Sequence, residues 1–213
     1  KEYNAKVIFL STSRIYPIKS LEKVEYKETE NRFEIKTTQK IRGLSIHGIA
    51  ETFPKEGARS FYGMTKYSSE LLLQEYMDFF DLNAIINRCG VLTGPYQMGK
   101  VDQGVVTLWM AKHFWKKKLN YIGFGGNGKQ VRDILHVDDL SNLLIDQIRH
   151  FNLYNQGTFN VGGGNEISIS LKELTNWCQK VTGNIIPIDS VPKTRVADIP
   201  IYFSDYRKIK SVN

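Results

Sequence analysis

The chain has 213 residues, of which 41% are hydrophobic and 12% aromatic, enough to form the core of one domain with a small annex. No apolar stretch reaches the roughly 18–20 residues that span a bilayer, so we expect no membrane partner. The net charge of +7 is dispersed and lacks an aromatic and basic RNA-binding motif, so we expect no nucleic acid but an anionic small molecule such as a nucleoside diphosphate.

The two cysteines, Cys89 and Cys178, lie far apart and show neither metal-ligand spacing nor a disulfide framework. We therefore expect no metal site and a reducing, cytoplasmic setting. Cys178 follows a helical pattern of apolar residues and is predicted to lie in the core.

Taken in chain order, the first half predicts a strand over 5–10 that ends in Ser11-Thr12-Ser13. Residues 19–60 are polar and lack clear periodicity, which predicts a long surface excursion. A helix is predicted from Tyr62 to about Phe80, and a further strand over 82–88. The apolar side of that helix is predicted to consist of Leu71, Leu72, Leu73, Tyr76, Phe79 and Phe80.

The second half predicts a helix near 103–117, a hairpin over 121–137, and a helix capped by Asp138 or Asp139. A strand over 158–161 and a helix over 171–181, begun by Ser168 or Ser170, follow. Strands that alternate with helices favour a parallel α/β sheet.

Three glycines, Gly123, Gly125 and Gly128, have the Gly-x-Gly-x-x-Gly spacing of a dinucleotide-binding loop. That fingerprint has meaning only where a strand enters the glycines and a helix follows them. The apolar residues after Gly128 alternate as in a second strand, so the pattern favours a turn and not a cofactor loop.

The spacing Tyr-x-x-x-Lys occurs at Tyr62/Lys66, Tyr96/Lys100 and Tyr206/Lys210. The second pair lies in a predicted loop and the third at a chain end. Tyr62 and Lys66 begin a strong helix, which places both side chains on one face. Because ligands bind at the carboxyl ends of parallel strands, Thr12 is expected to meet Tyr62 there.

This combination suits hydride-transfer chemistry. A free phenol has a pKa of about 10, and a neighbouring ammonium group lowers it toward neutrality. The phenolate of Tyr62 then takes a proton from a sugar hydroxyl while the carbon gives hydride to a nicotinamide. The alternative is a surface tyrosine beside a solvated lysine.

Six segments, in order, resemble the extended short-chain dehydrogenase/reductase family of nucleotide-sugar epimerases and dehydratases: FLSTSRIYP (9–17), SFYGMTK (60–66), RCGVLTGP (88–95), GNGKQVRDILHVDDL (126–140), FNVGGG (159–164) and RVADIPIY (195–202). The resemblance implies an α/β fold: the later strands of a Rossmann-like parallel sheet plus a small α+β substrate domain. The N-terminal βαβ half with the glycine-rich loop is absent from this chain, which we expect not to be an intact enzyme. Residues 1–100 are expected to be the remaining NAD-binding part and 101–213 mainly the substrate domain, with parts near 131–161 returning to the sheet.

The resemblance also implies the site. Thr12, Tyr62 and Lys66 are the expected catalytic residues, and NAD is the expected cofactor, bound by Ser11, Tyr62, Lys66 and Cys89. Arg132 and Arg195 are expected to hold the diphosphate of a nucleotide sugar, Asp198 its ribose and Tyr202 its hexose. The full expected substrate set is Thr12, Ser13, Val91, Arg132, Arg195, Asp198 and Tyr202. Without the resemblance, Arg132 reads as a surface strand residue and Arg195 as a loop residue.

Departures from the family pattern narrow the activity. Dehydratases carry Asp-Glu after the catalytic threonine, where this chain has Ser13-Arg14, so an epimerase is favoured. Many 4-epimerases have asparagine at the position of Val91. The motif Asp102-Gln103-Gly104 with GNGKQVRD is most similar to the subfamily that epimerises carbon 2 of CDP-paratose.

Epimerisation at carbon 4 of a UDP-sugar is the main alternative activity, and a non-catalytic dinucleotide-sensing or nucleic-acid-binding relative is another alternative.

The helix of Tyr62 resembles the family's dimer-forming helix, so a homo-oligomer is expected. The 213 residues alone are expected to be inactive.

Overall fold

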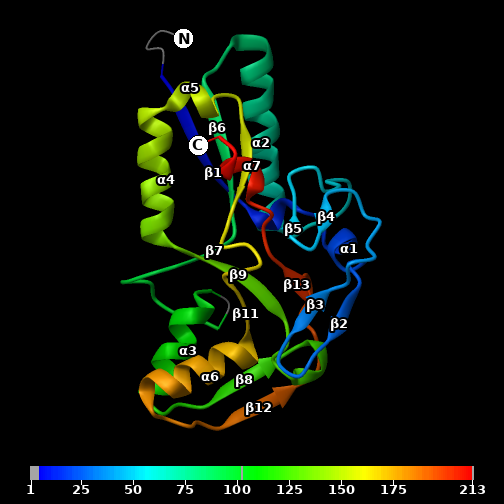
Figure 1. The fold of residues 1–213 in the computed structure, drawn as a ribbon, viewed down its shortest axis with the longest axis vertical. Helices are drawn as coiled ribbons and strands as arrows, with labels where there is room; N and C mark the ends of the chain where they lie inside the picture. The colour runs from blue at the N-terminus through cyan, green and yellow to red at the C-terminus, as the bar shows by residue number, and fades with distance from the viewer. Residues whose placement is uncertain (1–4, 102, 213) are drawn as a thin grey trace.

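A parallel sheet of three strands lies at the centre of one end of the molecule (Figure 1). The structure is a computed structural model that describes residues 5–101 and 103–212, so Asp102 of the motif above lies outside the described residues. The strand order is β1 (Val7–Thr12), β6 (Ala84–Cys89) and β10 (Thr158–Val161). Thr12 and Val161 both pair with Cys89, so the three strands end at one edge.

Helices cover both faces of this sheet, which explains why its central strand β6 is buried along its whole length. Helix α2 (Phe61–Phe80) packs on one face through Met77 against Ile86. Helix α4 (Val137–Arg149) packs on the other through Leu140 against Ile85. The predicted α/β class with a parallel sheet is confirmed.

A second sheet forms around β9 (Val131–His136) (Figure 1). Its partners are β7 (Val91–Thr93) and β13 (Ile201–Tyr202), both parallel, and β11 (Ser168–Ser170), antiparallel. Of the segment 131–161, β10 therefore joins the central sheet, whereas β9 belongs to the second one.

The predicted hairpin over 121–137 is wrong in its pairing. Strand β8 (Leu119–Ile122) pairs in parallel with β12 (Ile188–Val191), while β9 pairs elsewhere. Between β8 and β9 lies the short η2 (Phe124–Gly126), and positive φ angles at Gly123 and Gly128 redirect the chain. A strand follows these glycines, so they do not form the entry to a helix.

A small apolar cluster forms between two helices and β8. Helices α3 (Val105–Phe114) and α6 (Leu171–Thr182) pack together over β8. Cys178 is fully buried there beside Trp109 and Leu174, which confirms its predicted place in the core.

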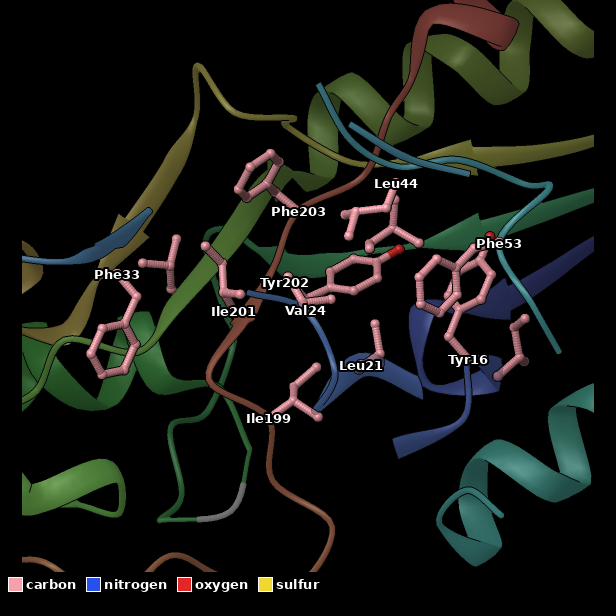
Figure 2. Packing of buried hydrophobic residues seen from close by; sticks show 13 residues of the cluster. Tyr16, Leu21, Val24, Phe33, Leu44, Phe53, Ile199, Ile201, Tyr202 and Phe203 are labelled. Carbon is pink, nitrogen blue, oxygen red and sulfur yellow. The ribbon is translucent and has the colours of Figure 1, made fainter. Parts of the chain in front are cut away.

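The predicted surface excursion over 19–60 is wrong, because this segment supplies much of the largest apolar cluster. It contains the short elements α1 (Ile18–Leu21), β2 (Tyr26–Glu28), β3 (Phe33–Ile35), β4 (Leu44–Ser45) and β5 (Gly48–Ile49). Figure 2 shows Leu21, Val24, Phe33, Leu44 and Phe53 gathered with Tyr202 and Ile201. The apolar residues of this segment are isolated in the sequence and follow no helical or strand period. Tertiary contacts bring them together into a core, which the local pattern therefore did not predict.

Helix α2 also differs from its prediction. Its buried residues are Gly63, Glu70 and Met77, whereas much of the predicted apolar side faces outward. The exposed members of that set are Leu71, Leu72, Tyr76, Phe79 and Phe80. The helix bounds, by contrast, agree with the prediction.

Two helix starts show how side chains fix the boundaries. His136, and not Asp138 or Asp139, caps α4, and both aspartates lie in its first turn. Ser170 caps α6 in a capping box with Glu173, which confirms one of the two predicted starts. The remaining short helices are η1 (Ser13–Ile15), α5 (Phe151–Tyr154) and α7 (Arg207–Lys210).

Replacing Ser170 by Ala is expected to lower the free energy of unfolding by about 1 kcal/mol, because the backbone N–H of Glu173 loses its acceptor. Urea unfolding curves measure the loss. Ser211→Ala, at the end of α7, is the control, and an equal effect of the two substitutions would contradict a capping role for Ser170.

Candidate functional site

The expected catalytic residues lie at the edge where the central strands end. Thr12 ends β1, Cys89 ends β6 beside it, and Tyr62 and Lys66 lie in the first turns of α2. The Lys66 ammonium donates to the Leu10 carbonyl at 2.9 Å, which ties the helix to the strand. Burial raises the pKa of the Cys89 thiol to about 11, and the positive charge of Lys66 opposes this rise.

A glycine lets the start of α2 approach the end of β1. A Cβ atom at Gly63 would lie 2.1 Å from the carbonyl oxygen of Arg14. Ser60 caps the helix by accepting from the Gly63 N–H at 3.1 Å. Tyr62 is therefore presented beside the segment that follows Thr12, with its side chain 56% exposed and open to a ligand.

A buried network that no sequence pattern predicted anchors the same helix. Glu70 is fully buried and receives hydrogen bonds from the Ser11 hydroxyl and from Arg88, with an Arg88–Glu70 ion pair of 2.7 Å. Arg88 also donates to the Tyr16 hydroxyl at 3.3 Å, and Tyr16 donates to Asn160 at 2.7 Å. Burial raises the pKa of Tyr16 to about 12. The hydroxyl of Ser11, an expected cofactor ligand, is thus engaged by the helix.

Two adjoining hollows lie beyond this edge. The smaller, of about 40 Å³, has Ser13, Ser60 and Tyr202 in its lining, whereas Thr12, Tyr62 and Lys66 line neither hollow. The larger, of about 250 Å³, runs under α3 and α6 and is lined by apolar side chains with Asp198 and Gln130. Arg14, Val91 and Arg132 line both hollows. The crevice therefore has a narrow end beside Ser13, a basic junction and a wider, more apolar end.

The Arg132 side chain at this junction is paired with other groups of the protein. Its guanidinium donates to Asp198 at 2.8 Å and to the carbonyls of Val131 and Ile199 at 2.7 and 2.6 Å. Burial lowers the pKa of Arg132 to about 10, the charge of Arg14 acts in the same direction, and Asp198 opposes both. Asp198, expected to accept from a ribose, is the counter-ion of this arginine.

The other expected substrate residues are distributed unevenly. Ser13, Val91 and Tyr202 line the smaller hollow. Tyr202 is buried, and burial raises the pKa of its hydroxyl well above the usual value. Arg195 lies in the exposed loop before β13, donates to the Val101 carbonyl at 3.5 Å and does not line either hollow.

The sequence pattern did not point to Gln130, which directly precedes β9 and lines the larger hollow together with Arg132. Its Nε2 donates to the Ile122 carbonyl at 3.0 Å, whereas its buried Oε1 has no hydrogen-bond partner among the described residues. A residue that lines the larger hollow thus carries a buried acceptor that lacks a donor.

The described side chains differ in how well they suit a metal ion and NAD. Within 5–101 and 103–212, no group of His, Cys, Asp and Glu side chains is arranged to hold a metal ion. None of the helices that the structure describes is long and apolar enough to cross a membrane. For NAD, the hydroxyl group of Tyr62 and the ammonium group of Lys66 are of a kind that suits a nicotinamide ribose at a strand-end crevice. In the described part, no strand leads through a Gly-x-Gly-x-x-Gly loop into a helix.

The sheet, its covering helices and the polar groups at the carboxyl ends of its strands define a Rossmann-like α/β protein with a ligand crevice at that edge. A profile of the NAD dependent epimerase/dehydratase family matches residues 1–162. The chain belongs to this family, as its resemblance implied.

Relatives show the same relationship. The chain is 28% identical over 208 residues to CDP-paratose 2-epimerase of Salmonella typhi, covering 97% of this chain and 58% of that protein. It is 25% identical over 171 residues to UDP-glucose 4-epimerase of Corynebacterium glutamicum, covering 76% of this chain and 50% of that protein. The chain thus spans little more than half the length of these relatives.

Solved structures share the fold. UDP-glucose 4-epimerase of Thermus thermophilus in complex with NAD superposes with a TM-score of 0.73 at 20% identity, covering 99% of this chain and 58% of that one. UDP-N-acetylglucosamine 4-epimerase of Methanobrevibacter ruminantium gives a TM-score of 0.73 at 20% identity, covering 100% and 58%. This likeness supports the Rossmann-like assignment.

Proposed function

We propose that the protein is an NAD-dependent nucleotide-sugar epimerase that converts CDP-paratose to CDP-tyvelose by inverting carbon 2. The observation that supports this proposal is the hydrogen bond from Lys66 of α2 to Leu10 of β1, because it brings the start of the helix that carries Tyr62 to the strand that Thr12 ends. Inversion at carbon 4 of a UDP-sugar is the alternative, since relatives with that name match the chain as well.

Each of the three residues has a separate role in the proposed reaction. Tyr62 is the base that takes the proton of the sugar hydroxyl, and Thr12 orients the same oxygen. Lys66, fixed to the strand through Leu10, brings a positive charge to this end of the helix. NAD, when bound, would supply the acceptor and donor of the hydride. The crevice would let the keto sugar turn over between the two transfers, and Tyr62 returns the proton to the sugar oxygen.

The base is assigned from the larger hollow. Gln130 offers an acceptor there, because its amide nitrogen is fixed on the Ile122 carbonyl. The exocyclic amine of cytosine is a donor, whereas uracil places a carbonyl oxygen at the same ring position. This contrast supports a cytidine nucleotide.

Replacing Gln130 by Met is expected to weaken CDP binding about tenfold and UDP binding by much less, because one buried hydrogen bond to the cytosine amine is lost. Calorimetric titration measures both affinities, and thermal unfolding checks that the variant is folded. Gln74→Met, on α2 and remote from the hollow, is the control. Equal losses for CDP and UDP would contradict the assigned base contact.

The proposed activity is tested with the full-length protein, NAD and either CDP-paratose or a UDP-hexose, followed by NMR of the sugar ring protons. Inversion at carbon 2 of the CDP-sugar is the expected result. Inversion at carbon 4 of the UDP-sugar alone selects the alternative, and no turnover of either substrate refutes the epimerase.

We also propose that the protein forms a homo-oligomer through α2. The outward residues of this helix include Phe61, Leu72 and Phe79, which are 89%, 60% and 74% exposed. Such a contiguous apolar helix face is typical of an interface. Sedimentation analysis showing only monomers at micromolar concentration would refute this proposal.

A further inference from the structure

Helices α3 and α6 end side by side, away from α2 (Figure 1). Trp109, near the middle of α3, donates to the Thr175 hydroxyl of α6 at 3.0 Å. Asn184, just past the end of α6, donates to the carbonyl of His113 near the end of α3 at 3.1 Å. The contacts advance in the same direction along both helices, so the helices are parallel and their C-terminal ends lie together.

Five large apolar side chains at these two ends face outward. Phe114 and Trp115 end α3, are 63% and 68% exposed, and lie in an edge contact with ring centroids 4.9 Å apart. The full set, called the apolar patch, is Phe114, Trp115, Trp177, Val181 and Ile185. Because a soluble protein rarely leaves a large apolar area exposed without a partner, the patch indicates an interaction surface.

The surroundings of the apolar patch are basic. Residues 103–132 and 174–188, which include α3, β8 and most of α6, contain no Asp or Glu. Among the described residues, Lys118 is the only lysine around the patch that has an ion pair, with Asp189. The positive charge is therefore largely uncompensated and favours an anionic partner. The lysines around the patch are Lys112, Lys116, Lys117, Lys118 and Lys180.

The mixture of side chains favours a bilayer surface among the anionic partners. Exposed Trp and Phe side chains suit the boundary between lipid headgroups and acyl chains, and lysines suit anionic headgroups. Val181 and Ile185 add apolar area to the patch but cannot stack on nucleic-acid bases, which single-stranded nucleic acids require of their partners. The set of cations around the patch also lacks arginine, the residue best suited to phosphate and base recognition.

We propose that the ends of α3 and α6 attach the protein to the surface of a membrane rich in anionic phospholipids. The apolar patch enters the headgroup layer, and the lysines contact the lipid phosphates. The expectation of no membrane partner concerned a spanning segment, whereas a surface contact of this kind needs none.

The membrane contact leaves the crevice accessible. The larger hollow is lined by residues in the first turns of the same two helices, including Val105 and Leu171. The apolar patch lies at the other ends of these helices. The inference goes beyond the proposed function and does not depend on it.

The test is co-sedimentation of the full-length protein with vesicles of equal parts phosphatidylglycerol and phosphatidylcholine, and with vesicles of phosphatidylcholine alone. Binding to the anionic vesicles should be at least about tenfold tighter and should weaken as salt is added. Lys116→Gln combined with Lys117→Gln should weaken it about 30-fold, since two contacts with the charged surface are lost. Trp115→Ser should weaken it about tenfold, because less apolar area enters the headgroup layer.

Matched controls make the same chemical changes away from the patch. Lys19→Gln combined with Lys23→Gln removes two exposed lysines at α1, and Leu153→Ser removes an exposed apolar side chain from α5. Both should bind vesicles like the unaltered protein. Equal losses for the patch and control variants would overturn the proposal, because net charge alone would then explain the binding.

The remaining outcomes identify other partners. Full-length protein that stays in the supernatant with the anionic vesicles overturns the proposal. If it then binds a mixed-sequence oligonucleotide and Trp115→Ser abolishes that binding, the patch contacts nucleic acid. If instead Trp115→Ser breaks up an oligomer in sedimentation analysis, the patch joins copies of this chain.

Two further measurements complete the test. Unchanged thermal unfolding of the patch variants shows that a lost affinity is not a lost fold. Epimerisation measured without vesicles reports on the proposed function separately: its absence, with vesicle binding intact, refutes that function and leaves the membrane contact standing.

Discussion

Replacing Tyr62 by Phe in the full-length protein is expected to slow epimerisation about a thousandfold, because the sugar hydroxyl loses its proton acceptor. The phenyl ring keeps the size of the side chain, and the ring is already 56% exposed, so the fold should not change. Single-turnover kinetics with NMR of the sugar product measure the effect. Nucleotide-sugar affinity should stay within a few-fold of the unaltered value, since the hydroxyl acts mainly in the chemical step.

Tyr96→Phe is the matched control for this prediction. Tyr96 has the same spacing to a lysine, Lys100, but it is fully exposed and has a φ angle of +66° in a loop. Its substitution should leave the rate unchanged. A Tyr62→Phe variant that epimerises at the normal rate would remove the phenol from the mechanism, even with the fold intact.

Replacing Arg88 by Met is expected to lower the free energy of unfolding by about 3–5 kcal/mol, because the fully buried Glu70 loses its counter-ion. In a chain of this size that corresponds to a fall in the unfolding temperature of about 10 °C. Differential scanning calorimetry measures it.

The double substitution Arg88→Met with Glu70→Leu separates charge burial from packing. Removing both partners should recover most of the lost stability, because no unpaired charge remains. Failure of the double substitution to recover it would show that the network matters through its shape, including the Ser11 and Tyr16 hydrogen bonds, and not through the ion pair.

Local patterns in the sequence determined the parts of the fold that depend on neighbours in the chain. The 3.6-residue period and the cap at Ser60 specified α2, and the capping box at Ser170 specified α6. Short β-branched runs specified β6 and β10. Because parallel strands end at one edge, the same patterns also predicted that Thr12 and Tyr62 would lie at one end of the sheet.

Tertiary structure alone decided the features whose residues are remote in sequence. The core formed by residues 19–60, the partners of β8 and β9, and the outward face of α2 depend on contacts that no local period encodes. The same holds for the Arg132–Asp198 pair, which joins residues 66 positions apart and gives the Arg132 guanidinium a counter-ion. Sequence spacing identifies which groups can do chemistry, whereas charge balance depends on which of them meet in space.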